Sequence, residues 1–145
     1  MVNPFLVFVI SYFLSLGGYL LGKSTKEELK EIKSKIKLTF NFLIFLSYIY
    51  LVYLVYKNIF ELFFLIILII IFYLSFRNNL IEPFHHVAFL TFSFIIFNSN
   101  SQLELFLIPI FSIFLYHSIE KWEIKNEVYK AILSLICFFF FSVVL

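Results

Sequence analysis

Five ionisable side chains that could do chemistry stand in two short stretches of an otherwise apolar chain. Glu82 precedes His85 and His86 by three and four residues. His117 precedes Glu120 by three. At helical spacing, each carboxylate can share a face with an imidazole. Two imidazoles with one or two carboxylates suit zinc or a similar divalent ion, and the same groups could exchange protons near neutral pH. Packing and hydrogen bonding of these side chains is the simpler interpretation.

No other catalytic pattern accompanies these residues. The chain has no Asp, no glycine-rich phosphate loop, no Cys-x-x-Cys, no His-Glu-x-x-His and no Gly-x-Ser-x-Gly. Cys137 is the single cysteine and lies in an apolar run, so it forms no internal disulfide. The sequence therefore does not favour an enzyme. It predicts no cofactor unless the histidines and glutamates bind a divalent metal.

The composition indicates the environment in which these groups work. Apolar residues make up 63% of the 145, Phe alone occurs 23 times, and the mean hydropathy is +1.03. Soluble proteins have an apolar share of about 45 to 50%. The chain is therefore predicted to be an all-α integral membrane protein. Its net charge of only +2 gives no electrostatic support for binding nucleic acid.

The apolar residues fall into blocks that predict one bundle of six transmembrane helices in a single domain, 1–145. The predicted spans are about 4–22, 38–56, 60–76, 80–97, 103–119 and 128–145. The first would be roughly 28 Å long as a helix, close to the hydrocarbon thickness of a bilayer. The fourth block is short, so four spans plus a re-entrant hairpin at 84–119 is the alternative. Six spans are favoured because lipid does not tolerate exposed irregular backbone and the turn at 98–102 is polar.

Basic residues set the predicted orientation of this bundle. The loops 23–37, 77–83 and 120–130 carry six, one and three Lys or Arg, whereas the opposite side holds only Lys57. Basic loops stay in the cytoplasm. We therefore expect a multi-pass protein of the cell membrane with those loops inside and both termini outside.

The most basic loop has a helical pattern of its own. Its lysines at spacings of four, three and four lie on one face: Lys26, Lys30, Lys33 and Lys37. Leu29, Ile32 and Ile36 lie on another. A short basic amphipathic cytoplasmic helix is predicted, with each lysine contributing about 1 kcal/mol toward anionic lipid head groups. The alternative is a solvated loop that only sets orientation.

Small residues on the first block suggest how the protein acts. Ser11, Ser15, Gly18 and Gly22 form one stripe, which is typical of close helix packing. The sequence thus predicts a protein that works by packing, as a subunit of a membrane assembly or as a homo-oligomer. The alternative is a transporter or channel for protons or a divalent metal, with the His and Glu side chains at its cytoplasmic mouth. A third hypothesis is an enzyme that uses the same residues on a lipid head group.

Overall fold

The structure, a computed structural model, describes residues 4–75, 77–78 and 81–120, and within the last segment 128–129, 131–132, 135–137, 139–140 and 143. The helices are α1 (Pro4–Ser24), α2 (Lys26–Val55), α3 (Ile59–Ser75), α4 (Glu82–Ser99), the short 3₁₀ helix η1 (Leu103–Phe106) and α5 (Leu107–Ser118). The predicted all-α fold is confirmed for the described residues.

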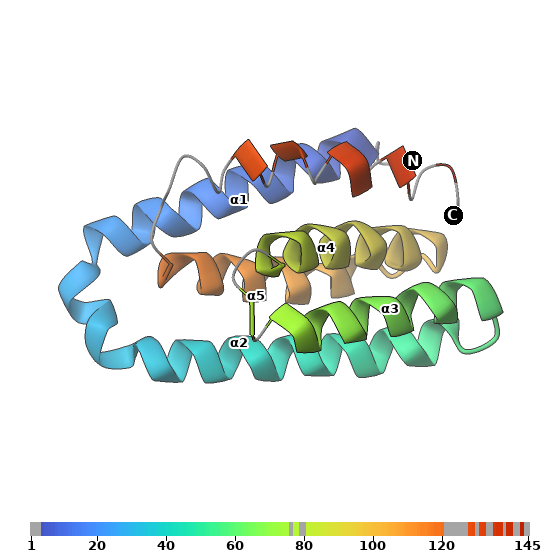
Figure 1. Cartoon of the computed structure of the whole chain (residues 1–145), viewed down its shortest axis with the longest axis horizontal. Helices are drawn as coiled ribbons and strands as arrows, with labels where there is room; N and C mark the ends of the chain where they lie inside the picture. Colours follow the sequence, from blue (N-terminus) through green and yellow to red (C-terminus); the bar gives the residue numbers. More distant parts are fainter. Residues whose placement is uncertain are drawn as a thin grey trace.

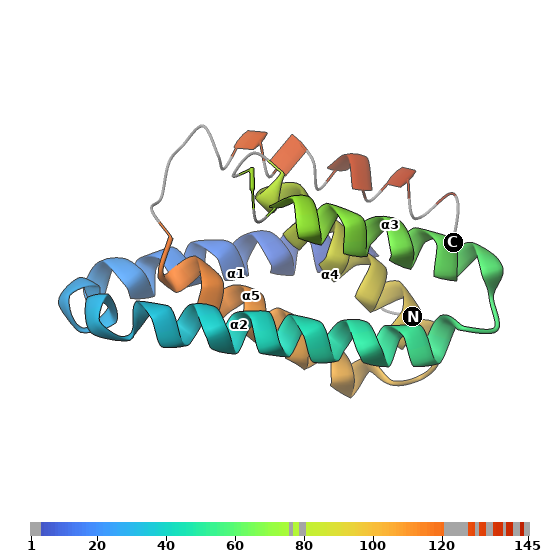
Figure 2. The same ribbon diagram turned by 60° about the horizontal axis from the view of Figure 1, so that its bottom comes forward.

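Consecutive helices run in opposite directions along one long axis (Figures 1 and 2). The α1–α2 corner, the start of α4 and the end of α5 therefore share one end of the bundle, which we call the basic end because the lysines of α2 lie there. The α2–α3 and α4–η1 turns share the other. Helical pieces within 128–143 lie beside α3, where the rings of Phe64 and Phe140 are 5.5 Å apart.

The basic segment is not a separate surface helix, and that prediction is wrong. Lys26 to Lys37 forms the first turns of α2, which continues without a break to Val55. The reason is that no Gly or Pro separates the charged segment from the apolar one, and helix propagation across the boundary is favourable. The corner before it lies at Thr25, where the Ser24 and Thr25 hydroxyls both donate to the Leu21 carbonyl.

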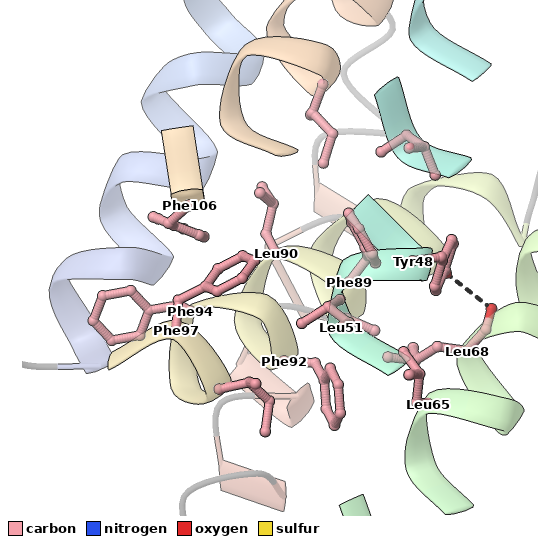
Figure 3. Close-up of a cluster of buried hydrophobic side chains, with 14 of the residues drawn as sticks. Tyr48, Leu51, Leu65, Leu68, Phe89, Leu90, Phe92, Phe94, Phe97 and Phe106 are labelled. Atoms are coloured by element: carbon pink, nitrogen blue, oxygen red, sulfur yellow. Dashed lines mark hydrogen bonds between the residues drawn. The ribbon is translucent and has the colours of Figure 1, made fainter. Parts of the chain in front are cut away.

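Helix α4 forms the centre of the core. Its apolar side chains are buried on every face, because α1, α2, α3 and α5 all pack against it. Phe89 and Phe92 meet Leu51 of α2 and Leu65 of α3 between the helices, as Figure 3 shows. The Tyr48 hydroxyl donates to the Leu68 carbonyl at 3.2 Å beside this layer (Figure 3).

Large apolar side chains lie on the surface of the bundle, and several polar side chains are buried beside its apolar core. Large hydrophobic side chains are exposed along α2 and α3: Phe42, Phe45, Tyr53, Ile59, Phe60, Phe63, Ile66 and Tyr73. Polar side chains are buried between the helices: Ser47, Ser75, His85, His86, Ser93, Ser112, His117 and Ser118. Large exposed apolar faces mark surfaces that meet lipid or another protein.

Within the described residues, one helical stretch is long and apolar enough to cross a membrane, Glu31–Val55. The stretches Ile59–Ser75, Phe84–Ser99 and Leu103–Ser118 are apolar but shorter. The predicted sixth span, 128–145, lies only partly within the described residues. By length and composition the described residues thus contain one potential membrane span, and the six-span bundle stays a prediction.

Candidate functional site

The site lies at the basic end of the bundle, where α4 begins and α5 ends. Helix α4 starts at Glu82 with proline in its first turn, a position where the missing amide hydrogen costs nothing. One turn later His85 and His86 point into the bundle and are buried. The last turn of α5 carries His117, also buried, and Glu120 follows just beyond it. The antiparallel arrangement thus brings all five predicted residues to one end.

His85 is held by a tyrosine from α2. Its Nε2 lies 2.6 Å from the Tyr48 hydroxyl, which also reaches the Leu68 carbonyl oxygen at 3.2 Å. The tautomer of the imidazole decides whether Nε2 donates to the tyrosine oxygen or accepts from it. Nδ1 has no hydrogen-bond partner among the described residues. The ring packs against Phe72 and Phe89, with centroids 4.8 and 5.7 Å away. His85 is therefore a packed, hydrogen-bonded core residue.

His86 and His117 meet across α4 and α5. Their ring centroids are 5.5 Å apart and the rings are perpendicular. His117 Nδ1 lies 2.8 Å from a carboxylate oxygen of Glu120, and the Tyr19 hydroxyl of α1 donates to the same oxygen at 2.9 Å. This group ties the end of α5 to α1. An ion pair forms when the imidazole is protonated.

Glu82 contacts α5 and borders a pocket. The Tyr116 hydroxyl donates to its carboxylate, so the first turn of α4 is fastened to the last turns of α5. Beside this contact lies a pocket of about 80 Å³. Its polar lining comes from four helices: Lys37, Asn41, Ser75, Glu82, His86 and Tyr116. This is enough space for two or three waters at about 30 Å³ each.

The clustered residues do not form a metal-ligand set. Among the described residues, which include all five predicted ligands, no group of three or more His, Cys, Asp or Glu side chains could hold a metal ion. Hydrogen bonds hold two of the imidazoles, His85 through Nε2 to the Tyr48 hydroxyl and His117 through Nδ1 to Glu120.

No protein-family model, curated protein or solved structure matches the chain. Function therefore has to be argued from the geometry and chemistry of the site itself. Two features carry that argument: a buried polar cluster inside an apolar exterior, and a pocket lined by both signs of charge.

Two residues of the predicted small-residue stripe, Gly18 and Gly22, pack against α5. A Cβ atom at Gly18 would stand 2.8 Å from the Phe114 carbonyl oxygen, and one at Gly22 would stand 2.0 Å from that of Ser118. Such close approach of two helices requires glycine. The side chains of Ser11 and Ser15 lie outside the described residues.

The structure describes the side chains of two of the four lysines that were predicted to face lipid head groups. Lys33 and Lys37 are exposed on α2, and Lys37 also lines the pocket. The side chains of Lys26 and Lys30 lie outside the described residues. Lys37 is thus the lysine of this group that the structure connects to the polar cluster.

Sequence reasoning missed the three tyrosines that hold the cluster, Tyr19, Tyr48 and Tyr116. Each bonds to a predicted residue from a distant part of the chain. A signal existed for Tyr48, because a tyrosine in the middle of an apolar helix must find a partner for its hydroxyl. That signal does not say which partner.

Proposed function

We propose that this chain is a multi-pass membrane protein that crosses the bilayer six times and acts by helix packing, as a subunit of a membrane assembly or as a homo-oligomer. The observation that carries the proposal is the large exposed apolar surface of α2 and α3. In water this surface would be costly to expose. In a bilayer it meets lipid chains or the helices of a partner.

The lengths of α3 and α4 support this proposal. At 1.5 Å per residue, α3 and α4 are roughly 26 and 27 Å long, close to the hydrocarbon thickness of about 30 Å. Each arm of a re-entrant hairpin would need to reach only part of that depth. The length of α4 therefore favours a complete crossing. In the proposed orientation, the basic loops and the end with His86 and Glu82 lie in the cytoplasm and both termini lie outside.

Packing is a better fit to the interior than conduction. Beyond the histidines, Phe89, Phe92 and Leu51 pack together between the helices (Figure 3). A path for protons or ions needs polar groups or water across this depth. We therefore do not extend the proposal to a transporter or channel for protons or a divalent metal.

The topology can be tested with single cysteines in a Cys137→Ser background. We expect Lys57→Cys and Asn100→Cys to react with a membrane-impermeant maleimide on intact cells. Lys33→Cys and Arg77→Cys should react only after permeabilisation. All four side chains are exposed, so labelling reports the side of the membrane and not burial.

Position 100 separates the two topologies. It lies in the turn after α4, which is outside in the six-span topology and does not reach the outside when 84–119 is a re-entrant hairpin. Labelling of Lys57→Cys without Asn100→Cys would support the hairpin. Labelling of all four sites on intact cells would overturn the proposed orientation.

The packing function predicts a particle larger than one chain. In mild detergent we expect blue-native electrophoresis and light scattering to report a complex. The protein mass in that complex should exceed the 17.4 kDa of one chain. In the Cys137→Ser background, Phe63→Cys on the exposed face of α3 should form a disulfide-linked dimer if the protein is a homo-oligomer. Phe111→Cys, exposed on α5, is the matched control.

A hetero-complex would give a different result in the same experiment. Neither cysteine variant would cross-link to itself, and a second polypeptide would co-purify in fixed ratio. A monomer without any partner, obtained from gently solubilised membranes, would contradict the proposed function.

A further inference from the structure

A second pocket lies on the side of the bundle, between α2 and the segment that runs from the end of α4 into α5. Its volume is about 270 Å³, and Phe97 of α4 forms part of its wall. Three of its lining side chains, Leu46, Ile49 and Ile108, are also exposed, so the pocket opens at the surface of the bundle. We call it the apolar pocket, because none of the described residues that line it is charged.

The two hydroxyl groups in this lining use their protons within the protein. Ser47 donates to the Leu43 carbonyl oxygen at 2.9 Å, and Tyr50 donates to the side-chain oxygen of Gln102 at 2.6 Å. The Tyr50 bond joins α2 to the turn before η1, and the Tyr50 ring also meets the ring of Phe97, with centroids 6.1 Å apart. The wall of the apolar pocket is thus fixed by contacts within the chain, and it offers a guest no hydroxyl proton.

In the proposed topology, the apolar pocket lies at the depth of the outer leaflet. Tyr56 and Lys57 mark the outer interface, where tyrosine rings and lysine side chains are common, and the Lys57 ammonium lies 5.5 Å from the centroid of the Tyr56 ring. Tyr50 and Leu46 precede Tyr56 by six and ten residues. At 1.5 Å per residue they lie about 9 and 15 Å below it, and half of the hydrocarbon core is about 15 Å thick. The distal half of an outer-leaflet acyl chain therefore reaches the pocket.

The size and lining of the apolar pocket favour hydrocarbon over water. An apolar cavity of about 150 Å³ stays dry and takes up benzene. The larger volume of this pocket, about 270 Å³, gives room for roughly eight to ten carbons of a chain. An uncharged chain needs no hydrogen bond, and the lining presents almost only apolar side chains to it.

We propose that the apolar pocket holds the distal half of one acyl chain of an outer-leaflet phospholipid, and that this lipid stays bound while the surrounding lipids exchange. Its head group stays at the interface and does not enter the pocket. The placement in the outer leaflet rests on the proposed function and its topology. The preference of the pocket for a hydrocarbon chain rests on its lining alone.

The test uses the full-length protein, solubilised gently from membranes, and native mass spectrometry to count the phospholipids that it retains. We expect one retained phospholipid per chain, with any head group, because the lining of the pocket carries no charge. After removal of this lipid with excess detergent, lysophosphatidylcholine with a myristoyl chain should bind again. The hexanoyl analogue should bind more weakly by about tenfold or more, because its chain ends before the pocket and buries fewer methylene groups.

A variant that fills the pocket assigns the site. Ile108→Trp places an indole in the pocket from its rim, so it should weaken binding of the myristoyl lipid by about tenfold, the loss of a few buried methylene groups. Ile66→Trp, at a similarly exposed isoleucine on α3, is the matched control and should bind like the parent protein. Leu46→Trp fills the same pocket from α2 and decides the matter should Ile108→Trp lose its circular dichroism spectrum.

The outcomes separate this inference from the proposed function. Failure of the parent protein to bind the myristoyl lipid, or equal binding by the parent and the pocket-filling variants, overturns the acyl-chain site. Binding that follows the head group and not the chain length overturns it as well. Should the pocket-filling variants instead break up the complex seen in blue-native electrophoresis while the parent binds no lipid, a second copy fills the pocket. A retained lipid on a monomer would support the site and contradict the packing function, and a complex without lipid would do the reverse.

Discussion

Replacing Gly22 by alanine is expected to destabilise the protein by roughly 3 kcal/mol, at the upper end of what overpacking costs. The added Cβ would lie 2.0 Å from the Ser118 carbonyl oxygen and 2.9 Å from its carbonyl carbon. Both are backbone atoms, so the clash is relieved only when α1 and α5 move apart. That movement would also pull Tyr19 away from the Glu120 carboxylate that it binds.

Gly17→Ala is the matched control on the same helix. Its Cβ would meet the Phe114 ring at 3.4 Å, a side-chain contact that can yield by a small rotation. Alanine also favours the helix by about 1 kcal/mol over glycine. Thermal unfolding in detergent micelles, followed by circular dichroism, should show a large drop for Gly22→Ala and little change for Gly17→Ala. Equal stability of the two variants would show that α1 and α5 do not approach as closely as described.

The bounds of α3 and α4 could be predicted closely because apolar blocks and their polar breaks define them. The block predicted at 60–76 is α3 at Ile59–Ser75, and the block at 80–97 is α4 at Glu82–Ser99. The polar residues between 98 and 102 end α4 as expected. The break between residues 37 and 38 was wrongly predicted, because a change from charged to apolar side chains does not by itself interrupt a helix.

The grouping of the candidate site residues could also be predicted, but their partners could not. Helical spacing together with antiparallel neighbours places Glu82, His86 and His117 at one end of any such bundle. Which hydroxyl meets which ring depends on the rotation and register of each helix. Tyr48 and His85 are 37 residues apart, and only their packed helices set the 2.6 Å contact between them. The burial of the histidines is likewise a consequence of α4 lying in the centre.

Phe89→Ala is expected to cost about 3–5 kcal/mol, the usual range for a large cavity in a core. Phe89 is fully buried in α4, and its ring lies 4.7 Å from that of Tyr48 and 5.7 Å from that of His85. Truncation removes the ring and also the packing contacts that it makes with the hydrogen-bonded pair Tyr48 and His85. We therefore expect the loss to exceed that from removing an equal ring at any exposed position.

Phe63→Ala provides that comparison, because the Phe63 ring is 59% exposed on α3. Where the micelle holds one chain, this variant should change the free energy of unfolding little, since detergent chains then solvate the exposed ring in both states. The two variants remove the same atoms, so the difference between them measures whether the ring faces protein or the apolar medium. Denaturant titrations in micelles, followed by tryptophan fluorescence, supply the two free energies. A large loss for Phe63→Ala would instead indicate that α3 packs against a second chain, and this loss should then disappear at protein concentrations low enough to dissociate the complex.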